Sequence, residues 1–175
     1  MVDDIRIVLS DVDGVWTDRK IYIGEDGCQL RAYSTEDSIG VVLLKIMQLP
    51  LVILTGEDNN SLKNRMERLK VAHIFTGVRN KLYIAEQALK KYDLTLSQAA
   101  FVGDDLNDLP LIRAAGFSAV PANAMQLLKD HAAVTLTKTS GNGVFREFCE
   151  EIARKKGIFN QVIDEYTRNI TKFTY

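Results

Sequence analysis

Short apolar runs alternate along the chain with longer segments in which apolar residues recur every three or four positions. The short runs have the length of buried strands, and the longer segments have the spacing of amphipathic helices. Strands that alternate with helices are typical of a parallel sheet covered by helices, so the pattern predicts an α/β fold. The predicted strands are residues 5–10, 51–55, 72–76, 99–103, 117–120 and 132–136. The predicted helices are residues 36–48, 60–70, 80–93, 106–116 and 142–155.

Two segments depart from this alternation. Residues 20–33 contain two short strand-like arms around the turn GEDG, which predicts a β-hairpin inserted after the first strand. Residues 157–175 space their apolar side chains roughly as a helix does. Two interpretations of that tail stay open: a peripheral helix with a frayed end, or a segment that docks on another subunit. The length of 175 residues predicts one domain over residues 1–175.

Composition narrows the class of protein. A formal net charge of −1 and 46% hydrophobic residues argue against disorder and against a general nucleic-acid-binding surface. Cys28 and Cys149 lie far apart without metal-type spacing, which predicts free thiols in a reducing compartment. No stretch approaches the roughly 18 apolar residues of a membrane span, and the charged start MVDDIR is unlike a signal peptide. We therefore expect a cytoplasmic protein that binds neither nucleic acid nor membrane.

Polar residues gather where the predicted strands end. The first strand runs into VLSDVDGVWTD, where Asp11 and Asp13 occupy same-side positions of an extended chain. Two carboxylates so close repel each other unless a cation neutralises them. Ligands of open parallel sheets bind beyond the carboxyl ends of the strands, so the other strand ends matter too. Those ends carry Thr55, Gly56, Glu57, Gly77, Lys81, Asp104, Asp105 and Asp108.

Each of these residues has a plain structural explanation when it is taken alone. Asp13 and Gly14 form a common turn dipeptide, and Asp105 could only cap a helix. Lys81 could be solvated, although the first turn of a helix is unfavourable for a cation. Their arrival at one sheet edge from four different strands is what favours a functional site.

The residue types fit phosphoryl transfer. Hard oxygen ligands from two strand ends suit Mg²⁺, which would also relieve the carboxylate repulsion. Asp11 is then placed as a nucleophile on phosphorus, and Asp13 as the general acid and base. Thr55 and Lys81 would hold the phosphoryl oxygens as negative charge spreads over them.

The segments DVDGVWTD and LTG, Lys81, and the segment GDDLND, in that order, resemble the four motifs of the haloacid dehalogenase superfamily. This resemblance implies a Rossmann-like three-layer sandwich and a phosphatase whose catalytic residues are Asp11, Asp13, Thr55 and Lys81. It also implies Mg²⁺ held by Asp11, Asp104 and the main-chain carbonyl of Asp13. One departure is Asn80, where the family often has Asp; Asn can still cap the helix that begins beside it.

The chain has no room for a cap domain between the motifs. Together with GDDLNDLPLI, the segment GNGVFREFCE resembles the capless phosphatases of 3-deoxy-octulosonate 8-phosphate and related nonulosonate 9-phosphates. That group implies a homotetramer in which the hairpin and tail of neighbouring subunits close the active site. The segments DGVWTD, EDS, LTGE and GVFREF resemble the members that act on 2-keto-3-deoxy-nononate (KDN) 9-phosphate.

We therefore expect a sugar-acid phosphate as substrate, with KDN 9-phosphate first, N-acetylneuraminate 9-phosphate second and the octulosonate 8-phosphate third. Glu57 and Arg68 are the expected specificity pair, and one helix length between them argues against a direct salt bridge. Arg146 has two interpretations, a ligand of the substrate carboxylate or a partner of Glu150 one turn away. The residues predicted to bind substrate are Thr55, Gly56, Glu57, Arg65, Arg68, Gly77, Lys81 and Arg146.

Two other classes of protein share parts of this pattern. A phospho-receiver domain would need an acidic residue at the end of the middle strand, where Thr55 or Thr76 stands. A catalytically silent oligomerisation module of the same fold would tend to lose the nucleophile or the second acid. Asp11 and Asp13 are both present, which favours an enzyme.

Overall fold

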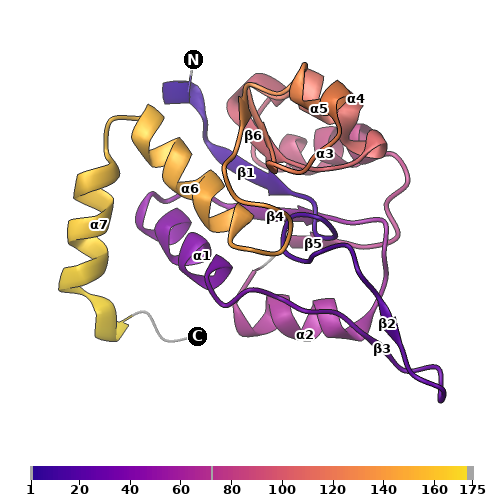
Figure 1. The fold of residues 1–175 in the computed structure, drawn as a ribbon. Coiled ribbons are helices and arrows are strands. Elements are labelled where there is room, and N and C mark those ends of the chain that lie inside the picture. The colour runs from indigo at the N-terminus through magenta and orange to yellow at the C-terminus, as the bar shows by residue number, and fades with distance from the viewer. Residues whose placement is uncertain (1, 72, 173–175) are drawn as a thin grey trace.

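A six-stranded parallel sheet forms the centre of the protein (Figure 1). The structure is a computed structural model that describes residues 2–71 and 73–172. The strand order is β5-β4-β1-β6-β7-β8, and each neighbouring pair is parallel. The predicted strands are confirmed within a few residues, except that residue 72 lies outside the described residues. Their bounds are β1 (Ile7–Ser10), β4 (Leu51–Leu54), β5 (His73–Phe75), β6 (Ala99–Val102), β7 (Phe117–Val120) and β8 (Val134–Thr135).

Helices cover both faces of the sheet, which confirms the three-layer prediction. Side chains alternate along β1, so that Val8 packs into one buried cluster while Ile7 and Leu9 pack into the other. The first cluster includes side chains from α1 (Asp37–Ile46), α2 (Asn60–Arg68), α6 (Val144–Lys155) and α7 (Phe159–Arg168). The second includes side chains from α3 (Lys81–Lys90), α4 (Leu109–Ala114) and α5 (Gln126–Lys129).

Shorter elements complete the chain. The 3-10 helices are η1 (Val2–Asp4), η2 (Leu96–Gln98), η3 (Leu106–Asp108) and η4 (Ile170–Lys172). The helix α5 follows β7 and was not predicted, because a helix of four residues is too short to give a periodic sequence pattern. Within the described residues, no helix is both long enough and apolar enough to cross a membrane.

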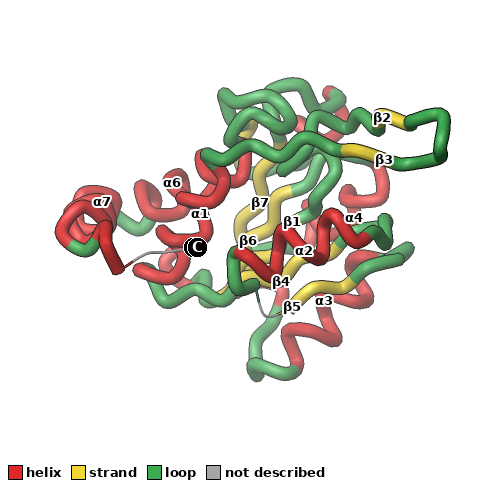
Figure 2. The backbone as a smooth tube through the Cα atoms, turned by 90° about the horizontal axis from the view of Figure 1, so that it is seen from below, coloured by secondary structure: helices red, strands yellow, loops and turns green. Residues whose placement is uncertain are grey.

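A hairpin projects from the body of the protein, as predicted (Figures 1 and 2). It consists of β2 (Tyr22–Ile23) and β3 (Gln29–Leu30), which pair antiparallel. Its apolar side chains are exposed, with Ile23 at 69% and Leu30 at 63%. The described part of the tail forms α7, which packs against α1 and α6 and buries Val162; docking of the tail on another subunit stays a prediction.

The order of the strands creates a crevice beside β1. The chain proceeds from β1 to β4 on one side of the sheet and returns later to β6 on the other side. Such a reversal separates the loops that follow the two central strands, and it is the usual ligand position in open α/β sheets. Trp16 anchors the loop after β1 to α6 and to the end of β1: its ring stacks on that of Phe145 with centroids 4.1 Å apart, and its indole N–H donates to Ser10 Oγ at 3.0 Å.

Candidate active site

A cavity of about 240 Å³ lies at the carboxyl ends of β1 and β4. Asp11 and Asp13 come from the loop after β1, and Thr55 comes directly after β4. The structure thus brings together most of the residues that the strand-end pattern singled out. The residues that line the cavity are Asp11, Asp13, Thr55, Gly56, Glu57, Lys81, Asp105 and Asn107.

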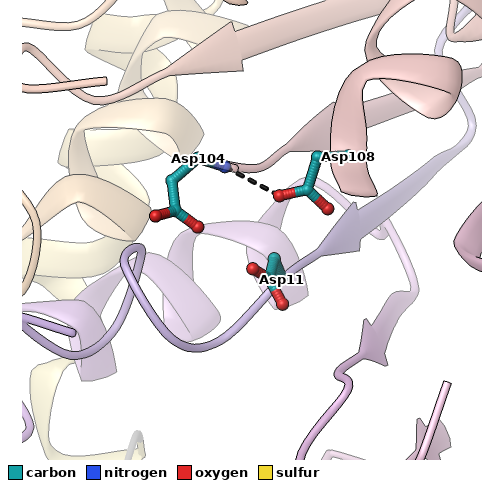
Figure 3. A group of neighbouring side chains, drawn as sticks. All are labelled: Asp11, Asp104 and Asp108. Carbon is teal, nitrogen blue, oxygen red and sulfur yellow. Dashed lines mark hydrogen bonds between the residues drawn. The ribbon is translucent and has the colours of Figure 1, made fainter. Parts of the chain in front are cut away.

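Three buried carboxylates, one of which lines the cavity, point toward one another (Figure 3). One oxygen from each of Asp11, Asp104 and Asp108 lies within 4.8 Å of the others. The N–H of Asp104 donates to Asp108 Oδ2 at 2.8 Å, which holds the loop after β6 in place. Gly14 has a φ of +98°, and a Cβ there would overlap the carboxylate of Asp104. The loops after β1 and β6 can therefore approach this closely only because residue 14 is glycine.

Lys81 joins two of these carboxylates. Its Nζ lies 2.8 Å from Asp11 Oδ1 and 2.6 Å from Asp108 Oδ1, and its side chain is 1% exposed. Lys81 is therefore an internal counter-ion, which excludes the solvated alternative. Burial lowers the pKa of Lys81, but Asp11 and Asp108 outweigh that effect and raise it, so the ammonium stays charged. Asn80 caps α3 by accepting the N–H of Tyr83 at 3.1 Å, as predicted for this departure from the family pattern.

The carboxylates retain an excess of negative charge. Burial raises the pKa of Asp11 well above its ordinary value; Asp108 adds to the rise, Lys81 opposes it, and Asp104 adds a smaller increase. Burial also raises the pKa of Asp104 to about 6, although Arg19 opposes the rise. Asp104 Oδ1 is buried without a hydrogen-bond partner. A further cation would stabilise the ionised form of both groups.

Hydrogen bonds within the chain hold several other side chains of the cavity. Asp13 is half-buried and accepts the hydroxyl of Thr17 at 2.9 Å, which fixes the direction of its carboxylate. Thr55 is buried, and its Oγ1 accepts the N–H of Glu57 at 3.2 Å. Asp105 caps η3 by accepting the N–H of Leu106 at 2.7 Å and also lines the cavity. Capping and cavity lining are thus compatible for Asp105.

Two arginines that the sequence pattern did not predict reach the site from the stems of the hairpin. Arg19 contacts Asp104 Oδ2 through Nε. Arg31 lies 3.5 Å from Asp13 Oδ1 and donates to Glu57 Oε2 at 2.8 Å. Their position in the sequence could have indicated this, because both flank the hairpin that follows the loop carrying Asp11 and Asp13. A second cavity of about 170 Å³ lies there and is lined by Asp13, Arg19, Ile21, Glu57, Asp104 and Asp105.

Four residues predicted to bind substrate lie outside the lining of both cavities. Arg65 donates instead to Ser38 Oγ at 2.7 Å, at the start of α1. Arg68 is exposed at the end of α2, and Gly77 is exposed. Arg146 pairs with Glu150 at 2.8 Å, one helical turn away, which is the structural alternative for that residue.

Glu57 has a cationic partner that the sequence did not predict. Glu57 and Arg68 were expected to act as a specificity pair without a direct salt bridge, each meeting the substrate or a different subunit, and that role stays a prediction. In the structure the cationic partner of Glu57 is Arg31, because the chain after β3 crosses the site and carries the guanidinium to the cavity. The carboxylate of Glu57 is therefore paired within its own chain, although its side chain is 51% exposed.

Comparison with known proteins agrees with this geometry. Residues 53–148 match the family model of haloacid dehalogenase-like hydrolases. Over 155 residues the chain is 32% identical to the 3-deoxy-D-manno-octulosonate 8-phosphate phosphatase KdsC of Escherichia coli K12, covering 89% of this chain and 82% of that protein.

Solved structures show the same likeness. A probable YrbI family phosphatase from Pseudomonas syringae superposes with a TM-score of 0.90 at 32% identity, over 95% of this chain and 94% of that one. The 3-deoxy-D-manno-octulosonate 8-phosphate phosphatase from Moraxella catarrhalis, in complex with magnesium, phosphate and KDO, also gives 0.90 at 32% identity. That match covers 94% of this chain and 95% of the other.

Proposed function

The chain belongs to the haloacid dehalogenase-like hydrolases, and on that basis we propose that it hydrolyses the phosphomonoester of a 2-keto-3-deoxy sugar acid through an aspartyl-phosphate on Asp11. The observation that carries the proposal is the meeting of Asp11, Asp13, Thr55 and Lys81 around one cavity. A nucleophile, an acid, a hydroxyl donor and a cation are the groups that phosphoryl transfer needs at one point.

The reaction has two steps. A carboxylate oxygen of Asp11 attacks phosphorus, the bond from phosphorus to the sugar oxygen breaks, and Asp13 protonates that oxygen as it leaves. Asp13 then takes a proton from water, whose oxygen attacks the phosphorus of the aspartyl-phosphate. The bond to Asp11 breaks and phosphate is released. Thr55 and Lys81 hold the phosphoryl oxygens in both steps, and Lys81 is fixed for this task by Asp108 at 2.6 Å.

The acidic cluster fits Mg²⁺. Asp11 and Asp104 offer oxygen ligands close together, and the buried Oδ1 of Asp104 has no hydrogen-bond partner. Asp108 is already engaged by Lys81 and by the N–H groups of residues 104 and 105, so we assign it to orientation. Asp11, Asp104 and the main-chain carbonyl of Asp13 would hold the ion. Mg²⁺ would supply charge stabilisation at the phosphoryl group and would keep Asp11 ionised.

Replacement of the nucleophile tests the mechanism. Asp11→Asn removes the attacking oxygen, and we expect phosphatase activity to fall by several orders of magnitude while the fold is retained. Asp18→Asn is the matched control, because Asp18 is an acidic residue of the same loop that does not line the cavity. Near-normal turnover by a folded Asp11→Asn protein would refute the mechanism.

The specific substrate that we propose is KDN 9-phosphate. Glu57 with its partner Arg31 forms a polar rim beside the phosphate position, suited to a hydroxyl-rich arm of the leaving group. The octulosonate 8-phosphate, third in the order expected from the sequence, becomes the second candidate because of the similarity to KdsC and to the KDO-bound neighbour. Side-by-side kcat/KM values for these two compounds and N-acetylneuraminate 9-phosphate decide the order. A tenfold preference for the octulosonate, about 1.4 kcal/mol, would overturn the KDN assignment and leave the phosphatase proposal intact.

We also propose a homotetramer in which the hairpin contacts neighbouring subunits. Ile21, Tyr22, Ile23 and Leu30 expose more apolar surface than a solvated hairpin needs. Light scattering at micromolar concentration should give a tetramer for the native chain and a smaller species for Ile23→Asp. Leu127→Asp replaces an exposed apolar residue on α5 and should leave the mass unchanged. A monomeric native chain would refute the assembly.

A further inference from the structure

Five carboxylates at the proposed site, those of Asp11, Asp13, Glu57, Asp104 and Asp108, have a cationic partner from their own chain. Lys81 serves Asp11 and Asp108, and Arg31 serves Asp13 and Glu57. Asp104 is served by Arg19, whose Nε contacts Oδ2 and whose guanidinium also donates to the main-chain oxygen of Asp104 at 3.4 Å. The chain thus supplies part of the positive charge that the acidic cluster requires.

Arg19 differs from the other two cations in how firmly it is held. The side chains of Lys81 and Arg31 are 1% exposed and each contacts two carboxylates, whereas the side chain of Arg19 is 38% exposed and contacts one. Arg19 also has a φ of 68°, in the left-handed region that is unfavourable for a residue with a Cβ. Its position at the stem of the hairpin leaves solvent on one side of the guanidinium.

Asp104 belongs both to these ion pairs and to the proposed metal site. Its carboxylate is buried, with Arg19 at Oδ2 and no hydrogen-bond partner at Oδ1. A dication held by Asp104 and Asp11 would lie close to the guanidinium, and like charges repel strongly where water is largely excluded. If Asp104 held both cations, the guanidinium and the dication would lie on neighbouring oxygens of one carboxylate, and their repulsion would weaken the binding of each.

We propose that Arg19 is a displaceable counter-ion of Asp104: it pairs with the carboxylate until Mg²⁺ binds, and the ion and the guanidinium exclude each other there. This inference rests on the proposed function, since it assumes that Asp104 is a metal ligand. It makes Arg19 a positioning residue that sets the concentration of Mg²⁺ at which the site fills. The side chain released from Asp104 can remain in the adjoining cavity of about 170 Å³ that it already lines.

The test measures Mg²⁺ binding directly, without turnover. Isothermal titration calorimetry at constant ionic strength compares the native chain with Arg19→Gln, which removes the charge and keeps most of the length. We expect the Kd for Mg²⁺ to fall about tenfold, equivalent to about 1.4 kcal/mol. Arg19→Lys keeps the charge and should bind Mg²⁺ much as the native chain does. Lys20→Gln is the matched control, because it removes a neighbouring positive charge whose contact is with Asp18.

Thermal melts give a second readout that also reports folding. In EDTA, Arg19→Gln should melt below the native chain, because Asp104 has lost its partner. Added Mg²⁺ should then raise the Tm of Arg19→Gln by more than that of the native chain. Weaker or unchanged Mg²⁺ binding by Arg19→Gln would overturn the inference; weaker binding would mean that Arg19 only orients Asp104.

Asp104→Asn separates this inference from the proposed function. If the native chain binds Mg²⁺ and Asp104→Asn does not, the metal site stands, and Arg19→Gln alone decides the role of Arg19. If the native chain and Asp104→Asn bind Mg²⁺ equally, Asp104 is not a ligand, and both the metal site and the inference fail.

Discussion

Asp37 should make the stability of the fold depend on pH. It opens α1 and accepts the N–H of Arg146 at 3.0 Å, so it ties the start of α1 to the first turn of α6. Its other oxygen, Oδ2, is buried without a hydrogen-bond partner. Burial raises the pKa of Asp37 from 3.8 to about 7, against the lowering effect of the backbone N–H groups of Arg146 and Phe145.

The sign of the effect follows from proton binding. Between pH 4 and pH 7 the folded chain keeps a proton on Asp37 that the unfolded chain has lost, so the free energy of unfolding falls as the pH rises. A pKa difference between 3.8 and about 7 corresponds to about 4 kcal/mol at most. About 2–3 kcal/mol of that loss lies between pH 5 and pH 8, which is a practical range for denaturation.

Urea titrations of the native chain and Asp37→Asn measure this loss. The amide cannot ionise, so Asp37→Asn should gain about 2–3 kcal/mol relative to the native chain between pH 5 and pH 8. Glu36→Gln is the matched control, because Glu36 is the exposed neighbour and only a minor cause of the raised pKa of Asp37, so most of the slope should remain. Parallel pH profiles for Asp37→Asn and the native chain would refute the reasoning and would mean that Asp37 is ionised in the fold below pH 5.

Three further changes test the support of the site. Lys81→Met leaves two buried carboxylates unpaired and should lower the free energy of unfolding by about 3–5 kcal/mol at pH 7, with part of the loss recovered at pH 5 in urea titrations. Gly14→Ala should weaken Mg²⁺ binding at least tenfold in calorimetry, because the added Cβ would displace Asp104. Gly27→Ala is the control: it also places a Cβ at a positive φ, but with no atom within 4 Å, so Mg²⁺ binding should not change. Trp16→Phe removes a buried hydrogen bond and should cost about 1–2 kcal/mol in urea titrations.

The strands and the acidic cluster could be predicted from the sequence because each rests on a local pattern. Buried parallel strands read as short apolar runs, and their register brings the residues after β1, β4 and β6 to one edge. Asp11 and Thr55 follow β1 and β4 directly, and Asp104 is the second residue after β6, so their meeting depends on topology alone. The hairpin was predictable for the same reason, since its turn GEDG lies between two apolar arms.

The charge partners could not be predicted because they depend on the path of a loop. Arg19 and Arg31 are 12 positions apart in the sequence, and only the closed hairpin brings both stems to the site. Arg146 illustrates the opposite case: its contact with Glu150 is local, and the helical spacing had already offered it as one of two alternatives. A long side chain on an exposed element can reach many partners, and the periodicity of the sequence does not show which of them it contacts.

The repulsion between neighbouring carboxylates remains the physical reason to expect a dication, but the carboxylate that most needs one is not the one expected from the sequence. Asp13 has Arg31 and the hydroxyl of Thr17 beside it, so the pair Asp11 and Asp13 does not by itself require a metal. The deficit lies one loop away, at Asp104, where a buried oxygen has no hydrogen-bond partner and burial raises the pKa to about 6. A cation bound there would also act on Asp11, whose pKa is raised by burial and which must lose its proton to attack phosphorus.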